Sequence, residues 1–412
     1  MKKKIYSLIL PAVIILTLIF SGCSIVTKNI YTTPNSTTTY TNVYTTNSNA
    51  GQTDLTTSIS NVKDSVVEIY SLVRNGYACG SGVIFMTEDK GLKNDYYIIT
   101  NFHVIENGTQ LTVITTFNNK QYSASLIGGD YYSDIAVIRI STSDILTVAT
   151  LYGSYDENGD ELDKDNNNTP LLTLENYLKF GQTVFAIGNP LGELPGSVSV
   201  GNISYINRVI EVEGISMTLL QTTSAINSGN SGGGLFDEHG NLIGIVNAKV
   251  KDEGVEGLGF AIPINYAYKM ASQLYKTYSE TENEVVSYGY IEGRTNLGLT
   301  LKTSNNLVYV YSIGNNSPCL TAVGNASTTL NGTPTTTVNG LNSNDILYSI
   351  NDSNVTTTNY KNLIKSVSIG STLNLTVIRT VREYQGFTYK TVEYYITFNI
   401  LIEQYIYQMP TA

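Results

Sequence analysis

The sequence of 412 residues predicts a mainly β protein, in which a barrel-like unit is followed by a smaller β-rich unit. Short runs of β-branched and aromatic residues alternate with turn signals made of Gly, Asn and Asp. Hydrophobic residues make up 42% of the chain, which is enough to fill real cores and excludes global disorder. One amphipathic helix is expected, over residues 265–278. These observations favour packed strands over alternating strands and helices.

The expected strands of the first unit follow one another from residue 65 to residue 262. Each is short and rich in Val, Ile, Tyr or Phe, which is typical of a sandwich or barrel. The helix closes this unit, and the polar stretch 279–284 is interpreted as a linker to the second unit, 286–400. The strands are expected at 65–70, 82–85, 96–100, 111–114, 135–138, 184–187, 242–246 and 259–262.

Charged residues are few, at 14% of the chain against about 25% in an average soluble protein. The net charge of −10 excludes a nucleic acid partner, because nothing would neutralise a phosphate backbone. The three cysteines, Cys23, Cys79 and Cys319, are too few for a disulfide framework, and with two histidines they indicate no zinc site. We expect no metal or organic cofactor, and we expect Cys79 and Cys319 to be separate buried thiols.

The N-terminus resembles that of a bacterial lipoprotein. Three lysines at 2–4 precede an apolar run over 5–20, as in a secretory signal peptide. The run ends in Phe-Ser-Gly-Cys at 20–23, and its resemblance to the lipobox implies a signal peptide over 1–22 and a lipidated Cys23. A lipid anchor would hold the protein at the extracytoplasmic face of a bacterial cell membrane. The alternative is an uncleaved N-terminal anchor with an incidental cysteine.

A serine embedded in glycines marks the first candidate site, Asn-Ser-Gly-Asn-Ser-Gly-Gly-Gly-Leu at 227–235. A nucleophilic serine needs a sharp turn that exposes its Oγ, and neighbouring N–H groups that converge on a developing oxyanion. Ser231 is the candidate nucleophile. A glycine-rich hairpin loop without chemistry is the alternative for this segment taken alone.

A serine nucleophile needs a general base, which histidine supplies best at neutral pH. His239 lies in a polar turn close in sequence to Ser231, which leaves His103, at the end of an expected strand, as the candidate base. Asp134 begins the strand 135–138 and is the candidate carboxylate that orients the imidazole. The competing carboxylate, Asp130, follows a glycine pair.

The three candidates occur in the chain order His, Asp, Ser, which is the order of chymotrypsin and differs from that of subtilisins and α/β-hydrolases. Their surroundings resemble the HtrA/Deg serine proteases, a family of chymotrypsin-fold enzymes followed by PDZ domains. The motifs that carry this resemblance are Thr-Asn-Phe-His-Val at 100–104, Ser-Asp-Ile-Ala-Val at 133–137 and Gly-Asn-Ser-Gly-Gly at 229–233. Supporting matches lie at 80–84, 186–192 and 257–263.

The resemblance implies a chymotrypsin-like double β-barrel with the catalytic site between the barrels. It assigns Ser231 as nucleophile, His103 as general base and acid, and Asp134 as the residue that orients His103. It also implies an oxyanion hole made of the N–H groups of Gly229 and Ser231. Residues just before this loop, Ala225 and Ile226, would form the floor of the substrate pocket; since neither is a carboxylate, cleavage is expected after small or medium aliphatic residues.

The serine loop departs from the family at two positions. Gly234 stands where the family usually has Pro, and Ser228 stands where Pro is frequent. Both changes give the loop more conformational freedom.

The second unit, 286–400, resembles a smaller PDZ-like α+β domain that binds peptide C-termini. Asn296, Leu297, Gly298 and Leu299 resemble the carboxylate-binding loop, and a helix expected over 360–367 would line the groove. A Thr/Asn-rich insertion, 321–339, interrupts this pattern. The alternative is a β domain that serves only as a spacer.

The expected function is that of a membrane-tethered extracytoplasmic serine endopeptidase, which acts in protein quality control on unfolded or damaged proteins. The resemblance also implies a homotrimer. A non-catalytic chaperone or a PDZ-type peptide-binding adaptor is the alternative. The expected organisation is a lipoprotein signal peptide at 1–22, a flexible Thr/Asn/Ser-rich tether at 23–57, a protease domain at 58–278 and a PDZ-like domain at 286–400.

Overall fold

The structure is a computed structural model, in which the predicted signal peptide at 1–22, the predicted lipidation site Cys23 and the predicted tether up to residue 53 lie outside the described residues. Asn296 of the expected carboxylate-binding loop lies outside them as well. The model describes residues 54–409 except 75, 157, 166–170, 190–193, 195, 213–214, 250–257, 282–283, 296, 314–316, 331, 386–387, 405 and 408.

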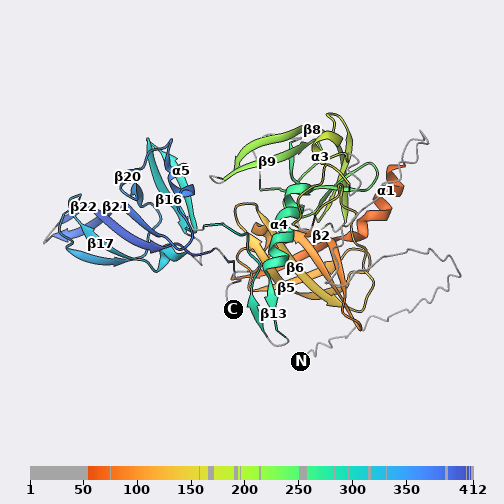
Figure 1. Ribbon diagram of the computed structural model, residues 1–412, viewed down its shortest axis with the longest axis horizontal. Helices are drawn as coiled ribbons and strands as arrows, with labels where there is room; N and C mark the ends of the chain where they lie inside the picture. Colours follow the sequence, from red (N-terminus) through yellow and green to blue (C-terminus); the bar gives the residue numbers. More distant parts are fainter. Residues whose placement is uncertain are drawn as a thin grey trace, which may run out of the picture. The chain divides into compact units, whose positions relative to one another are not determined.

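The first barrel is a closed antiparallel sheet with the strand order β1-β2-β3-β6-β5-β4 (Figure 1). Alternate residues of one strand face opposite sides of a sheet, and the two sides enter different cores. On β3, Ile98 lies inside this barrel's own core, whereas Ile99 belongs to the core shared with the second barrel. The strands are β1 (Val66–Val73), β2 (Gly76–Asp89), β3 (Asn94–Thr100), β4 (Gln110–Thr115), β5 (Gln121–Asp130) and β6 (Ile135–Thr142).

The second barrel is also closed, with the order β10-β11-β12-β9-β8-β7. At its centre Phe185 and Phe236, both fully buried, stack with ring centroids 5.5 Å apart. The sequence analysis did not predict β10, nor β8 and β9, which form a long hairpin whose exposed positions carry both polar and apolar residues. The strands are β7 (Thr183–Gly188), β8 (Ser197–Val212), β9 (Ile215–Thr222), β10 (Gly234–Asp237), β11 (Leu242–Val246) and β12 (Gly259–Pro263).

The helices of this part of the chain are short, apart from α4. Helix α4 (Ile264–Thr277) corresponds to the predicted helix at 265–278, and it packs against strands of both barrels, including β6 and β11 (Figure 1). Helix α1 (Leu55–Val62) begins inside the segment predicted as a tether, with the Asp54 side chain accepting a hydrogen bond from the N–H of Thr56. The others are the 3₁₀ turn η1 (Lys63–Ser65), α2 (Phe102–Ile105) and α3 (Leu174–Tyr177).

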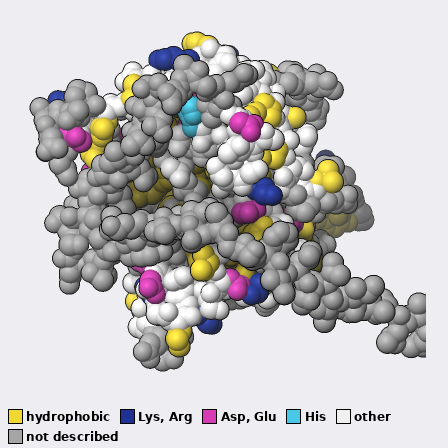
Figure 2. Space-filling model, turned by 90° about the vertical axis from the view of Figure 1, so that its right-hand side faces the viewer, with side chains coloured by type: hydrophobic (Ala, Val, Ile, Leu, Met, Phe, Trp, Pro, Cys, Tyr) yellow, Lys and Arg dark blue, Asp and Glu magenta, His cyan; other side chains and the backbone are white. Residues whose placement is uncertain are grey.

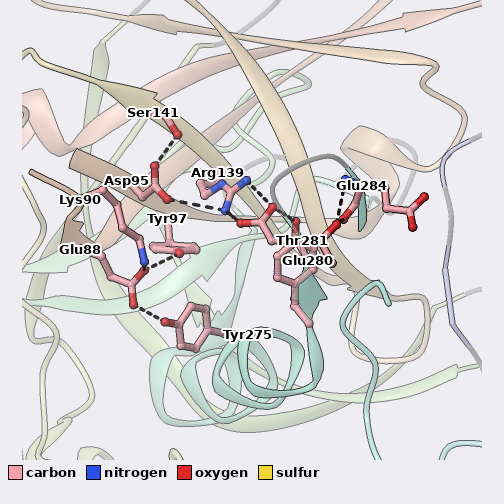
Figure 3. A network of polar contacts seen from close by, with 11 residues as sticks. Glu88, Lys90, Asp95, Tyr97, Arg139, Ser141, Tyr275, Glu280, Thr281 and Glu284 are labelled. Carbon is pink, nitrogen blue, oxygen red and sulfur yellow. Dashed lines mark hydrogen bonds and ion pairs between the residues drawn. The ribbon is translucent and has the colours of Figure 1, made fainter. Parts of the chain in front are cut away.

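The polar stretch 279–284 was expected to be a linker, and this expectation was wrong for its described residues. Strands β13 (Ser279–Glu280) and β14 (Val285–Ser287) pair as a short hairpin. Glu280 forms a bidentate ion pair with Arg139 of β6, which also lies 3.6 Å from Asp95 of β3 (Figure 3). A bidentate arginine fork holds a carboxylate in one orientation, so the hairpin is fastened to the first barrel.

The C-terminal unit is built on an eight-stranded sheet with the order β15-β16-β19-β21-β22-β17-β18 and β20 paired to β19. With helix α5 (Tyr360–Lys365), it fits a PDZ-like α+β domain. The insertion at 321–339 contributes β17 and β18 to the sheet. The elements are β15 (Leu299–Ser304), β16 (Leu307–Ile313), η3 (Pro318–Leu320), β17 (Val323–Ser327), β18 (Thr336–Asn339), β19 (Ile346–Ile350), β20 (Ser353–Asn354), β21 (Thr372–Gln385) and β22 (Thr388–Leu401).

The described surface carries few charged groups, and the two described cysteines are free thiols. On the coloured part of the face seen in Figure 2, charged side chains are few and lie among hydrophobic and uncharged groups. Cys319 is buried, which raises the pKa of its thiol to about 11, whereas Cys79 is only half-buried. Among the residues described, no helix is both long enough and apolar enough to cross a lipid bilayer. The mainly β fold with a double barrel and a PDZ-like unit, predicted from the sequence, is confirmed.

Candidate active site

His103 and Asp134 lie at the adjoining ends of β3 and β6, two paired strands of the first barrel, and meet directly. His103 lies on α2, directly after β3, and Asp134 immediately precedes β6. The imidazole Nδ1 lies 2.8 Å from Asp134 Oδ2, and the backbone N–H of His103 donates to Asp134 Oδ1 at 3.0 Å. Because a carboxylate only accepts hydrogen bonds, this contact keeps the proton on Nδ1 and leaves the lone pair on Nε2.

The backbone of Asp134 is strained, with φ at 53° in the left-handed region. Such a conformation is uncommon for a residue other than glycine and persists only where its surroundings hold it. Its carbonyl accepts two hydrogen bonds, from the N–H of Phe102 at 3.1 Å and from Asn101 Nδ2 at 3.0 Å. The segment that carries His103 therefore also fixes the direction of Asp134.

Ser231 comes from the second barrel, on the loop that leads into β10, and is buried. Its Oγ accepts a hydrogen bond from the N–H of Ala248 at 3.1 Å. The preceding residue, Asn247, donates from Nδ2 to Asp134 Oδ2 at 2.9 Å. Two consecutive residues therefore hold the serine and the aspartate, which belong to different barrels. Within the described part of the chain, Ser231 Oγ makes no hydrogen bond to His103.

Close backbone packing brings the histidine segment and the serine loop together. Gly80 of β2 lies between them: a Cβ added there would be 2.6 Å from the side chain of Val104 and 3.2 Å from the Ser231 carbonyl oxygen. Any larger residue would push these two segments apart. Hydrogen bonds and close packing thus link the segments that carry His103, Asp134 and Ser231, with Gly80 setting the spacing.

The N–H groups of Gly229 and Ser231 are available to an anion. The Asn230 N–H donates to the Asn227 carbonyl at 3.0 Å, which closes a turn over 227–230, and Gly229 has φ at 95°. Type I and type II turns differ by a rotation of the middle peptide, so the positive φ of Gly229 sets where its N–H points. Neither the Gly229 N–H nor the Ser231 N–H bonds to another described residue.

Only one of the two expected pocket residues is packed beside the serine loop. Ile226 is half-buried against the shared core, and Gly259 leaves the space for it, since a Cβ at Gly259 would lie 2.5 Å from Ile226 Cγ1. Ala225 is exposed. Lys249, which follows Ala248, places its Nζ 5.7 Å from the ring centre of Tyr131.

The described residues of the expected carboxylate-binding loop form a tight turn before β15. Gly298 has φ at 61°, and a Cβ there would lie 2.4 Å from the Cβ of Ser317. The Ser317 hydroxyl donates to the carbonyl of Leu297, which is buried, and Leu299 begins the strand. The loop therefore needs a glycine at position 298.

Sequence reasoning missed Asn247. A polar residue that follows an entirely apolar strand, here β11, was the available signal. The same pattern occurs at ordinary strand ends. Only the hydrogen bond to Asp134 of the other barrel identifies Asn247 as part of the site.

Comparison with known proteins agrees with this geometry. Residues 80–245 match the model of the trypsin-like peptidase domain. Serine protease Do-like HtrA of Bacillus subtilis is 32% identical over 320 residues, which cover 74% of this chain and 61% of that protein. Serine protease Do-like HtrB of the same organism is 42% identical over 200 residues, 47% of this chain and 38% of its own length. Serine protease Do-like HtrA of Lactococcus lactis is 29% identical over 322 residues, 73% of this chain and 67% of its own length. The chain thus spans less than two thirds of the length of either Bacillus protein.

The contact between Asn247 and Asp134 predicts a pH-dependent loss of stability in Asn247→Asp. Two carboxylates at a separation of 2.9 Å cannot both ionise without repulsion, so the folded pair keeps a proton that the unfolded chain releases near pH 4. The free energy of unfolding of Asn247→Asp should therefore be highest below about pH 4 and should fall as the pH rises towards 8. Urea unfolding between pH 4 and pH 8 measures this, with Asn247→Ala as the control that lowers stability by a constant amount. Parallel curves for the two variants would contradict the contact.

Proposed function

We propose that this chain, a homologue of the HtrA serine proteases that carries a trypsin-like peptidase domain, is a serine endopeptidase. The observation that carries the proposal is the continuous set of hydrogen bonds from His103 through Asp134 and Asn247, with the next residue, Ala248, bonded to Ser231. We further propose unfolded or damaged proteins as its substrates.

In the proposed reaction, the Ser231 oxygen attacks a peptide carbonyl and gives its proton to His103 Nε2. The tetrahedral intermediate collapses to an acyl-enzyme as the same proton passes to the leaving amine. Water then attacks the acyl group, His103 takes and returns a proton, and the free acid leaves. Asp134 stabilises the imidazolium that forms twice in this cycle.

Two features of the free protein fit this sequence of steps. The Ser231 Oγ bonds to the Ala248 N–H rather than to His103, so it must rotate towards Nε2 when substrate binds. Catalytic hydrogen bonds are often loose before substrate arrives. The Gly229 and Ser231 N–H groups would receive the oxyanion, and loss of one such donor usually lowers the rate by about 10²–10³.

A fluorophosphonate probe tests the nucleophile. We expect covalent labelling of the wild-type protein and a loss of at least about 10³-fold in Ser231→Ala, because no other serine among the described residues shares this environment. Ser228→Ala, in the same loop, is the matched control and should label normally. Labelling that is absent from the wild type would favour the chaperone or adaptor instead.

We propose that the substrate pocket accepts small or medium aliphatic side chains. The support is the half-buried, apolar Ile226 beside the serine loop and the absence of a carboxylate at 225 and 226. An apolar pocket gives no counter-charge to Lys or Arg, whose desolvation would then be uncompensated.

A peptide library tests this pocket. Cleavage after Ala, Val or Leu should exceed cleavage after Lys or Arg by at least about 10-fold in kcat/KM, because one uncompensated charge costs more than 1.4 kcal/mol. Ile226→Ala should shift the preference towards larger aliphatic residues. A profile led by basic residues would be incompatible with the pocket.

We propose that the PDZ-like unit binds peptide C-termini at the loop 296–299. Gly298 in the left-handed region and the strand β15 that follows it support a loop N–H nest beside a sheet edge. We also propose the lipid anchor at Cys23, the extracytoplasmic location and the homotrimer, which are expectations from the sequence.

Paired peptides test the loop. A peptide with a free C-terminal carboxylate should bind the full chain of Ser231→Ala at least about 10-fold more tightly than its C-terminal amide, measured by fluorescence anisotropy. Gly298→Ala should abolish the difference, since its Cβ would meet Ser317 at 2.4 Å. Equal affinities for both peptides in the unsubstituted loop would identify the unit as a spacer.

A further inference from the structure

Ser81 of β2 holds the serine loop with two of its polar atoms and contacts β3 with a third. Its N–H donates to the Ser231 carbonyl at 2.8 Å, and its hydroxyl donates to the Gly229 carbonyl at 2.8 Å. Its own carbonyl accepts the Thr100 hydroxyl at 2.7 Å. Ser81 is fully buried, so water does not compete for these bonds.

The Gly229 carbonyl is a sensitive point in the loop. It belongs to the peptide group that joins Gly229 to Asn230, which lies between the two peptide groups that carry the N–H groups of Gly229 and Ser231. The N–H of this middle group donates to the Asn227 carbonyl at 3.0 Å, and its oxygen accepts the Ser81 hydroxyl. Because both ends of the middle peptide are held, this group cannot flip, which limits how far the two flanking N–H groups can turn.

Further polar groups continue the hydrogen-bond network from Ser81 to Asn189 and Glu68. The N–H of Asn189, at the end of β7, donates to Ser81 Oγ at 2.9 Å. Its side chain donates from Nδ2 to Glu68 Oε2 at 2.8 Å, and Tyr70 donates its hydroxyl to the same oxygen at 3.1 Å. Because Ser81 Oγ already accepts from Asn189, its own proton is directed towards the Gly229 carbonyl.

Glu68 is an unfavourable residue for a structural role alone. It is 5% exposed and lies on β1, opposite Ser81, and no described lysine or arginine forms an ion pair with it. The titratable groups around it are Tyr70 and Cys79, neither of which is a cation. Burial of an unpaired carboxylate opposes folding, and a neutral side chain of the same shape would fill the site at less cost.

We propose that Glu68 and Asn189 are positioning residues for the oxyanion hole and act through the hydroxyl of Ser81. Glu68 fixes the Asn189 side chain, Asn189 orients the Ser81 hydroxyl, and Ser81 holds the peptide between the two oxyanion donors. None of the three contacts the reacting atoms. The inference rests on the proposed serine protease function and adds to it a buried support that spans both barrels.

Steady-state kinetics on a chromogenic aliphatic peptide, together with the affinity of a matching peptide boronate, test this support. Ser81→Ala should lower kcat by about 10–100-fold and weaken the boronate by the same factor, with KM changed less than about 2-fold, since the donors act on the tetrahedral state. Glu68→Ala should lower kcat by about 10-fold. Glu68→Gln keeps an acceptor for Asn189 and should recover the rate to within about 3-fold.

A matched control and a double variant separate positioning from folding. Glu88→Gln is the matched control, because it removes a different hydrogen-bonded carboxylate, which lies on β2. Glu88 contacts Tyr97 and Tyr275 away from the serine loop, so this variant should leave kcat unchanged (Figure 3). The double variant Ser81→Ala/Glu68→Ala should be no slower than Ser81→Ala, because Glu68 acts through Ser81. Boronate titration counts the folded active sites, so kcat refers only to native protein.

Three results would overturn the inference. They are wild-type kcat in Ser81→Ala, wild-type kcat in Glu68→Ala, and losses that multiply in the double variant. Failure of the underlying function looks different: the wild-type protein would then show no turnover, or turnover that survives in Ser231→Ala.

Discussion

The structure depends on the segment Asn247–Ala248, which hydrogen-bonds to groups from both barrels at once. Asn247 reaches Asp134 of the first barrel, and Ala248 reaches Ser231 of the second. A serine and a histidine from separate barrels can cooperate only if their spacing is fixed to within a fraction of an ångström. The shared core supplies the rigidity, because β2, β3 and β6 each give alternate side chains to the same cluster as the second barrel. The candidate site therefore lies at the seam where two closed sheets pack together.

One strained residue, Asp134, lies at this seam and is held by hydrogen bonds. Asp134 adopts a positive φ that two donors to its carbonyl maintain, and Gly229 adopts one that closes its turn. Each strained non-glycine residue costs on the order of 1–3 kcal/mol, which well-packed surroundings can offset. Glu68 adds a buried carboxylate to the same region. The site thus gathers groups that oppose folding, as expected where geometry rather than stability determines the residue.

Functional residues could be predicted from the sequence where a short local motif surrounds them. Ser231 among glycines and His103 at a strand end could be recognised because local spacing carries the signal. Asn247, Ser81, Asn189 and Glu68 could not, because each is a single polar residue in or beside an apolar strand, and only a partner distant in sequence gives it a role. Hydrophobic runs identified β11 and β12 but not the equally buried short strand β10. Strands β5, β8 and β9 also escaped notice, because polar or exposed residues interrupt their apolar pattern. The stretch 279–284 resembled a linker because its anchor, Arg139, lies on another strand.

The central claim is that Ser231 becomes covalently acylated during turnover. Rapid acid quench of the protein with an activated peptide ester, followed by intact mass measurement and peptide mapping, tests it directly. The account predicts one acyl group per chain, located on Ser231 and removed by hydrolysis on a longer delay before quenching. Hydrolysis of the ester without any acylated species, or an acyl group on a different residue, would contradict it.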